Sequence, residues 1–179
     1  MTINSEQNIK EIFVKAGWDG SSPVLVVRGG EQSLEYIPGG GEESLRWPVS
    51  TGLAGFGNQD GSGCTPTGLH KIAVCIGAAA EPGAVFKGRE LTGEVVASQS
   101  ELSGGDYITS RILWLSGLEE GVNRGGMVDS QNRYIYIHGT PYAAQLGQPV
   151  SAGCVRMADS DVIGLFDLVT VGTMVLILS

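Results

Sequence analysis

The sequence has few cationic residues and no long apolar run, and each shortage excludes a class of partner. Eleven lysines and arginines stand against nineteen aspartates and glutamates, which gives a formal net charge of −8 at pH 7. Nucleic acids and anionic membrane surfaces both attract basic segments rather than acidic ones. No stretch approaches the roughly 18 apolar residues of a transmembrane helix. We therefore expect no nucleic-acid partner and no transmembrane segment.

Cysteine and histidine are also scarce, which limits disulfide and metal chemistry. The three cysteines, at positions 64, 75 and 154, are an odd number without paired spacing, which predicts no disulfide framework. The two histidines, at positions 70 and 138, lie far apart and have no zinc-binding spacing. The glycine clusters match neither phosphate-binding motif of nucleotide-binding proteins. The sequence therefore predicts no metal and no nucleotide cofactor.

The amino-terminal residues give an expectation about localisation. Residues 1–15 lack the basic start, the apolar centre and the small-residue cleavage site of a signal peptide. The chain as written is therefore expected in the cytoplasm. It is expected in the cell envelope or periplasm if a targeting segment has been removed from it.

Glycine, in contrast, is abundant and points to a fold rich in turns. It accounts for 28 of 179 residues, while charged residues make up only 17%, a composition that favours β structure over a helical bundle. The length fits one domain. We divide the chain into a helical segment at residues 1–22 and a single domain at residues 23–179.

Periodicity predicts the individual elements. An apolar stripe from Ile9 to Ala16 indicates a short amphipathic helix that ends at Gly17. A second helix is predicted over residues 159–169, capped by Asp159 or Ser160. Residues 78–93 are expected to be irregular. Strands are predicted at residues 24–27, 34–37, 45–49, 69–76, 94–97, 112–115, 134–138 and 173–178.

Two nearby segments contain the residues of a cysteine-based acyl-transfer site. Residues 137–140 read Ile-His-Gly-Thr, and residues 151–157 read Ser-Ala-Gly-Cys-Val-Arg-Met. A thiol attacks as the thiolate, so Cys154 needs a base such as His138 or a positive field such as that of Arg156. Neighbouring glycines leave backbone amides uncovered, and these can point at a developing oxyanion. We therefore take Cys154 as the candidate nucleophile and His138, at a strand end facing a cleft, as the candidate base.

Each of these residues also has a structural interpretation. Cys154 could be a buried cysteine before a helix, and His138 an ordinary histidine at a strand edge. Arg156 could pair with Asp159 or Asp161, or it could orient residues and substrate in a pocket. Ser151 is expected to shape the turn, with its hydroxyl or backbone near the thiolate.

The remaining candidates are weaker. Tyr142 could stack on a substrate or be an ordinary surface aromatic residue. His70 and Cys75 lie in an apolar alternating run, so we expect both to be structural, with Cys75 as a small core residue. Cys64 lies in a glycine-rich loop and is expected to be incidental.

The two segments resemble the signature of the L,D-transpeptidase catalytic domain family, the YkuD type. The family form is His-Gly-Thr, a spacer, and Ser-His-Gly-Cys-x-Arg. Upstream, residues 65–68 read Thr-Pro-Thr-Gly and resemble a strand entry of that family. The resemblance covers residues 23–179, nearly the whole chain. One departure is Ala152, which stands where the family has a second histidine.

The resemblance implies a fold and an activity. The fold is a β-sandwich-like catalytic domain with a short N-terminal helix and one helix after the cysteine. The activity is acyl transfer on peptidoglycan stem peptides or muropeptides of the cell wall, through a Cys154 thioester that releases D-alanine. His138 is the implied base, with its other ring nitrogen bonded to the Gly139 carbonyl. The amides of Gly153 and Cys154 are the implied oxyanion donors, and Arg156 the implied pocket arginine.

Alternatives within this family remain open. An amine acceptor gives transpeptidation, whereas water gives L,D-carboxypeptidase activity on muropeptides. Because alanine lacks the donor and the charge of histidine, Ala152 predicts a higher thiol pKa than in a relative with Ser-His-Gly-Cys. It also leaves open a catalytically weakened module that only binds peptidoglycan.

Overall fold

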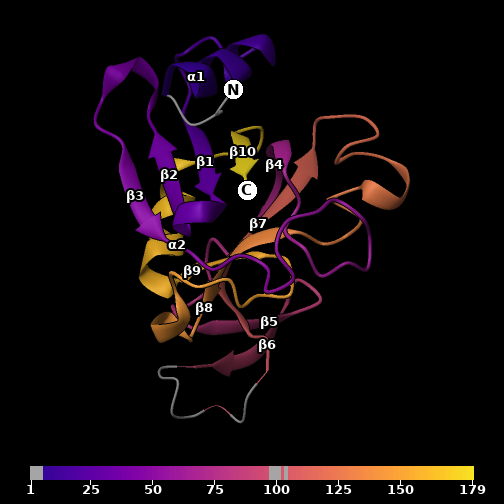
Figure 1. Ribbon diagram of the computed structural model, residues 1–179. Helices are drawn as coiled ribbons and strands as arrows, with labels where there is room; N and C mark the ends of the chain where they lie inside the picture. The colour runs from indigo at the N-terminus through magenta and orange to yellow at the C-terminus, as the bar shows by residue number, and fades with distance from the viewer. Residues whose placement is uncertain (1–5, 97–101, 103–104) are drawn as a thin grey trace.

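The structure is a computed structural model that describes residues 6–96, 102 and 105–179 (Figure 1). Within them, ten strands join one curled sheet, flanked by helices α1 (Glu6–Lys15) and α2 (Asp159–Leu168). The predicted mainly β fold, with a helix near the N-terminus and one after Cys154, is confirmed. Neither of these helices is long and apolar enough to span a membrane.

The sheet follows the order β3-β2-β1-β10-β4-β7-β5-β6, with β8 pairing on β7 and β9 pairing on β8. Strand β7 is therefore a branch point, since it contacts β4, β5 and β8. The strands are β1 (Val24–Arg28), β2 (Ser33–Ile37), β3 (Leu45–Pro48), β4 (Gly68–Ile76), β5 (Ala84–Lys87), β6 (Glu90–Val95), β7 (Ile108–Gly117), β8 (Tyr136–Thr140), β9 (Val155–Ala158) and β10 (Met174–Leu178).

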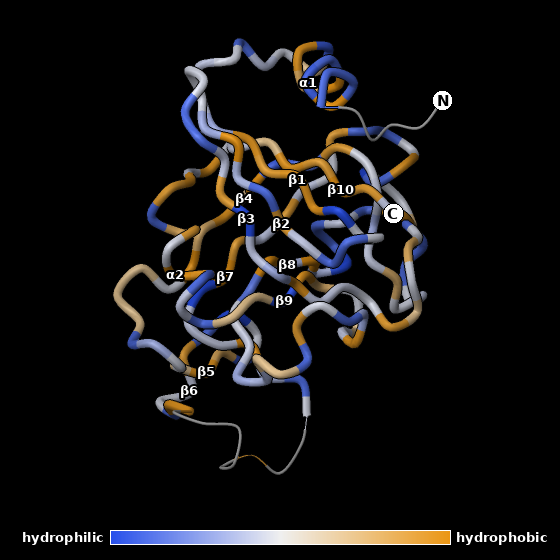
Figure 2. Tube along the Cα trace, turned by 60° about the vertical axis from the view of Figure 1, so that its left-hand side comes forward, coloured by the Kyte–Doolittle hydropathy of each residue, from blue (hydrophilic) through white to orange (hydrophobic). Residues whose placement is uncertain are grey.

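Strands β1 and β10 pair in parallel and are buried on both faces. Their near-continuous apolar sequences are typical of such strands. On the outer face, Ile9 and Phe13 of α1 pack against Val24 and Val26, all of them almost fully buried. The helix then ends, as predicted, before Gly17, whose φ of 96° favours glycine. Figure 2 shows the apolar course of β1 and β10 beneath α1.

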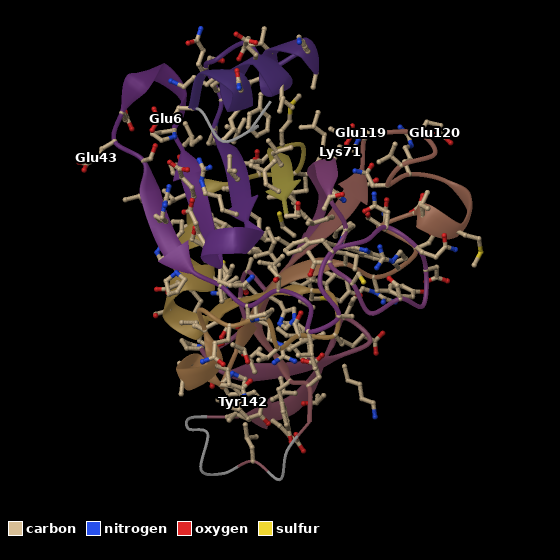
Figure 3. The ribbon with its side chains drawn as sticks, viewed as in Figure 1. Glu6, Glu43, Lys71, Glu119, Glu120 and Tyr142 are labelled. Atoms are coloured by element: carbon tan, nitrogen blue, oxygen red, sulfur yellow. The ribbon has the colours of Figure 1, made fainter. Side chains whose placement is uncertain are left out.

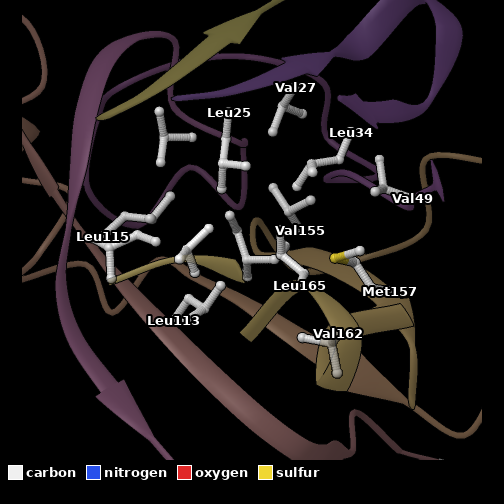
Figure 4. Packing of buried hydrophobic residues seen from close by; sticks show 14 of the residues in the cluster. Leu25, Val27, Leu34, Val49, Leu113, Leu115, Val155, Met157, Val162 and Leu165 are labelled. Carbon is white, nitrogen blue, oxygen red and sulfur yellow. The ribbon is translucent and has the colours of Figure 1, made fainter. Parts of the chain in front are cut away.

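The main core lies on the inner face of the curled sheet. Leu25 and Val27 of β1 face Val155 and Met157 of β9 there, and Leu165 of α2 closes the cluster (Figure 4). All five side chains are fully buried. Burial of each such side chain stabilises the fold by about 1.5–3 kcal/mol. The two facing layers give the domain its sandwich-like character and fix β8 and β9 against the rest of the sheet.

The prediction of irregular structure over residues 78–93 is wrong, because β5 and most of β6 lie there. Every residue of β6 is exposed, so its sequence has no alternation of apolar and polar residues to reveal it. A two-residue turn joins the strands, with φ values of 56° at Gly88 and 71° at Arg89. Such turns usually have asparagine or glycine at these positions. Residue 97, the end of the strand predicted over 94–97, lies outside the described residues.

Two further corrections concern the segments that hold His138 and Cys154. The strand predicted over residues 134–138 begins at Tyr136, because Tyr134 has a left-handed backbone with φ 55°. His138 therefore lies in the middle of β8 and not at its end. Strand β9 was not predicted. Helix α2 begins at Asp159 as predicted, but its N-cap is Ala158, without a side-chain hydrogen bond, so the predicted cap at Asp159 or Ser160 is wrong.

His70 of β4 is fully buried, in agreement with its structural interpretation. Its Nε2 lies 2.9 Å from the Ser130 hydroxyl oxygen, and its Nδ1 lies 3.0 Å from the Gly68 carbonyl oxygen. Burial lowers the pKa of His70 from 6.5 to about 4, against the opposing effect of the Gly68 hydrogen bond. The folded protein therefore holds this imidazole neutral at pH values where the unfolded chain protonates it.

We expect this difference to make the domain acid-sensitive. The unfolded chain binds the extra proton below about pH 6.5, so the free energy of unfolding decreases from there down to about pH 4. Each pKa unit corresponds to about 1.36 kcal/mol, so the loss from His70 is about 3 kcal/mol. Urea unfolding at several pH values will measure it, with His70→Gln as the matched variant. If the free energy of unfolding decreases with falling pH equally in both proteins, the assignment to His70 is contradicted.

Candidate functional site

The parallel pairing of β8 and β9 sorts the motif residues onto two faces. Ile137 pairs with Val155, and His138 pairs with Arg156. Because side chains alternate along a strand, Ile137 and Val155 enter the main core, and their neighbours point the opposite way. Cys154 packs on that opposite face in a cluster with Tyr136. The structure thus brings Cys154, His138 and Arg156 to one face of two adjacent strands.

The Cys154 thiol is partly buried and is held by the backbone at the start of β8. Its Sγ accepts the Tyr136 N–H at 3.4 Å and donates to the Tyr134 carbonyl oxygen at 3.5 Å. Burial raises the pKa of the thiol to about 11, although the Tyr136 hydrogen bond and the charges of Arg156 and Arg133 act in the opposite direction. The resting thiol is therefore protonated at neutral pH.

His138 is only 1% exposed, and its Nδ1 lies 2.8 Å from the Gly139 carbonyl oxygen. This is the contact that the resemblance implies. Burial lowers the pKa of His138, while the Gly139 hydrogen bond and the charge of Asp106 raise it. We assign the proton of the neutral ring to Nδ1, which donates to Gly139 and leaves Nε2 as the accepting nitrogen.

No hydrogen bond joins the thiol to the imidazole within the described part of the chain. Cys154 lies beside Tyr136, which precedes His138 by two positions on the same face of β8. Hydrogen bonds between catalytic groups are often long before substrate binds. The thiol of Cys154 would have to turn away from Tyr134 to reach His138.

Gly139 is confined between β7 and α2. A Cβ at this position would lie 2.4 Å from the Thr109 carbonyl oxygen and 2.5 Å from Oδ1 of Asp159. That carboxylate is itself fixed, since it accepts hydrogen bonds from the hydroxyls of Thr109 at 2.5 Å and Ser110 at 2.6 Å. Only glycine fits here, and its carbonyl is thereby placed to hold His138.

The turn before Cys154 is built on Ser151. Its hydroxyl donates to the Cys154 carbonyl oxygen at 2.5 Å and accepts the Gly153 N–H at 3.1 Å. Thr65, from the strand entry in the sequence motif, donates to the Gly153 carbonyl oxygen at 2.9 Å. The Gly153 amide, one of the two implied oxyanion donors, is therefore engaged within the turn.

Arg156 pairs with Asp106 at 2.7 Å, so the alternative in which it pairs with Asp159 or Asp161 is wrong. The Arg156 side chain is largely buried, and its Nε has no hydrogen-bond partner. Both charged groups line a groove of about 540 Å³. Its other lining residues are Leu53, Ala54, Gly63, Val150, Ser151 and Ala152. Ala152, the departure from the family motif, thus lies on the wall of this groove.

The remaining candidates lie outside this face or are better buried than expected. Tyr142 is only 8% exposed, which contradicts the surface interpretation, and its ring meets that of Tyr107 edge-on at 6.3 Å between centroids. Figure 3 shows it at the end of the molecule near β5 and β6. Cys64 donates to the Ala54 carbonyl oxygen at 3.3 Å. Cys75 is partly buried and packs against the main core.

Sequence reasoning missed Tyr136 and Arg133. Tyr136 precedes His138 by two residues, so the alternation of the strand could have placed both on one face. Arg133 gave no such signal, because its guanidinium donates to carbonyls of a distant loop. The acceptors are Gly57 at 3.2 Å, Asn58 at 2.9 Å and Cys64 at 2.7 Å.

A family model for the L,D-transpeptidase catalytic domain, YkuD, matches residues 22–177. The chain belongs to this family. As an L,D-transpeptidase catalytic domain, it has the mainly β fold and the single helix after Cys154 that the resemblance implied. No curated protein matches the chain significantly.

Solved L,D-transpeptidases share the fold of this catalytic domain. One from Mycobacterium smegmatis superposes with a TM-score of 0.54 at 18% identity, over 88% of this chain and 59% of that one. L,D-transpeptidase 3 from Mycobacterium tuberculosis gives 0.55 at 16%, over 88% and 61%. A cysteine-to-serine mutant from Enterococcus faecium gives 0.53 at 16%, over 88% and 50%. The domain thus spans about 50–60% of these chains.

Proposed function

We propose that this domain catalyses cysteine-dependent acyl transfer on peptidoglycan stem peptides. The Sγ of Cys154 attacks the carbonyl that precedes D-alanine, a C–S bond forms, and the C–N bond to D-alanine breaks. His138 accepts the thiol proton and returns it to the leaving amine. The observation that carries this proposal is the placement of Cys154 on one face with a neutral, buried His138 whose Nδ1 is tied to Gly139.

The pKa values favour a base that acts during the attack. The thiol has a pKa of about 11, and burial lowers the pKa of His138, so both groups are neutral before reaction. A thiolate formed in advance would be rare, and proton transfer therefore accompanies formation of the C–S bond. The positive charges of Arg133 and Arg156 stabilise the thiolate character that develops on Cys154.

The oxyanion and the substrate also require partners. Because Ser151 engages the Gly153 N–H, we propose the Cys154 N–H as the oxyanion donor. One such donor contributes roughly 2.7–4 kcal/mol in hydrolases where it has been removed. We assign Arg156 to a substrate carboxylate that takes the place of Asp106, since a buried guanidinium in a groove suits this contact.

A stem tetrapeptide incubated with and without an amine acceptor tests this function. We expect release of D-alanine in both reactions and a crosslinked peptide, detected by mass spectrometry, only with the acceptor. Release of D-alanine without a crosslink would identify an L,D-carboxypeptidase that acts on muropeptides. Unchanged tetrapeptide would contradict catalysis and favour a weakened binding module, for which Ala152 is the motivation.

A further inference from the structure

The turn between β5 and β6 places the Arg89 guanidinium against the aromatic side chains near Cys154. Its central carbon lies 4.9 Å from the ring centroids of both Trp114 and Tyr134. Its Nη1 donates to the Tyr136 hydroxyl at 3.1 Å. Such contacts hold a guanidinium in a defined plane and orientation.

Arg89 lacks the ion pair that four other arginines of the domain form. Arg28, Arg46, Arg124 and Arg156 each pair with a carboxylate, whereas Arg89 forms no ion pair within the residues that the structure describes. Arg111 and Arg133 also form none, but their guanidinium groups donate to backbone carbonyls. The charge of Glu90, the next residue in the chain, helps to raise the pKa of Arg89, after the larger effect of the Tyr136 hydroxyl, but Glu90 forms no ion pair with it. In a chain of net charge −8, this leaves Arg89 as a cation with open donors.

The backbone at Arg89 adopts a conformation that glycine and asparagine favour and that strains an arginine. Its φ of 71° lies in the left-handed region, where a long side chain is uncommon. Glycine or asparagine would suit this turn position better. Strained residues of this kind cluster at functional sites, where the side chain serves a purpose. The backbone conformation therefore gives no reason for arginine at this position, and its side chain does.

The aromatic residues that hold Arg89 also hold the thiol. The Tyr136 hydroxyl accepts from Arg89, and the Tyr136 N–H donates to Sγ of Cys154. The Tyr134 ring lies under Arg89, and the Tyr134 carbonyl accepts from the thiol. The guanidinium of Arg89 and the thiol of Cys154 are therefore separated by about the length of the Tyr136 side chain. A bound peptide can reach across this distance.

We propose that Arg89 binds a side-chain carboxylate of the peptide that Cys154 attacks, and that the domain therefore selects acidic over amidated stem peptides. This rests on the proposed function of Cys154. A guanidinium fixed by aromatic rings loses little freedom on binding, and its fork of N–H donors fits a carboxylate oxygen pair. An amide offers one oxygen and no charge, so it forms a weaker contact.

Binding measurements that do not require turnover test this selection. Calorimetry on a Cys154→Ala background will compare a tetrapeptide with free side-chain carboxylates and the same peptide fully amidated there. We expect the acidic peptide to bind at least tenfold more tightly, and Arg89→Gln to remove that difference. Arg89→Lys should restore part of it. Lys87→Gln, which removes an exposed cation of the same hairpin, is the matched control and should change neither affinity.

The outcomes separate recognition from positioning. If Arg89→Gln weakens both peptides equally, Arg89 only positions the tyrosines and the proposal is overturned. Equal affinity of the parent protein for both peptides, or no binding of either, also overturns it. In turnover assays, Arg89→Gln should raise KM for the acidic peptide alone. Charge-dependent binding without any release of D-alanine would sustain the role of Arg89 and refute the proposed reaction.

Discussion

Replacement of Cys154 by alanine should abolish the release of D-alanine from a stem tetrapeptide. The variant lacks the only atom proposed to bond to the substrate, so no thioester can form. Loss of the nucleophile lowers kcat on the order of a millionfold in a well-studied hydrolase. We expect activity below detection, and intact-mass measurement should show an acyl adduct on the parent protein and none on Cys154→Ala.

The other two cysteines provide matched controls for this experiment. Cys64→Ser keeps a donor for the Ala54 carbonyl, and Cys75→Ala removes a partly buried thiol that packs against the core. The Cys75 thiol thus lies against the main core, and the Cys64 thiol is turned to the Ala54 carbonyl. Both variants should still form the adduct. An adduct that disappears with Cys64 or Cys75 and persists in Cys154→Ala would refute the assignment of the nucleophile.

The elements predicted best were those whose sequences carry a clear period. The stripe of α1, the apolar sequences of β1 and β10, and the buried face of α2 were all found, because tertiary packing in these elements follows the local pattern. The first four residues of β6 were missed because the strand is exposed on both faces, and β9 was missed because its four residues are too few to show a period.

The candidate site could be predicted only in part, because some of its contacts leave no local pattern in the sequence. The motif identified Cys154 and His138, and the resemblance named the Gly139 carbonyl that does lie beside His138. The partner of Arg156 is Asp106, fifty residues away, and no local pattern connects them. Arg89 likewise reaches the tyrosines only because β5 pairs with β7 and β7 with β8. Such contacts depend on strand order, which the sequence leaves open.

Replacement of His138 by alanine should slow thioester formation by about 10²- to 10⁴-fold, the usual contribution of a positioned acid or base. The pH dependence should change as well. In the parent protein, burial lowers the pKa of His138, so the base is already neutral at pH 7 and the rate should be flat above it. Without the base, the rate must follow the thiolate, and it should rise about tenfold per pH unit up to the thiol pKa of about 11.

His138→Gln is a useful second variant, because His138 is buried in the middle of β8 and alanine leaves space there. Glutamine fills that space but accepts no proton at neutral pH. Urea unfolding will show whether either variant is destabilised. Both should lose the flat pH profile if His138 is the base, whatever their stability. A folded variant whose rate stays flat from pH 7 to 9 would show that another group accepts the thiol proton, since a thiol with a pKa of about 11 cannot ionise unaided in that range.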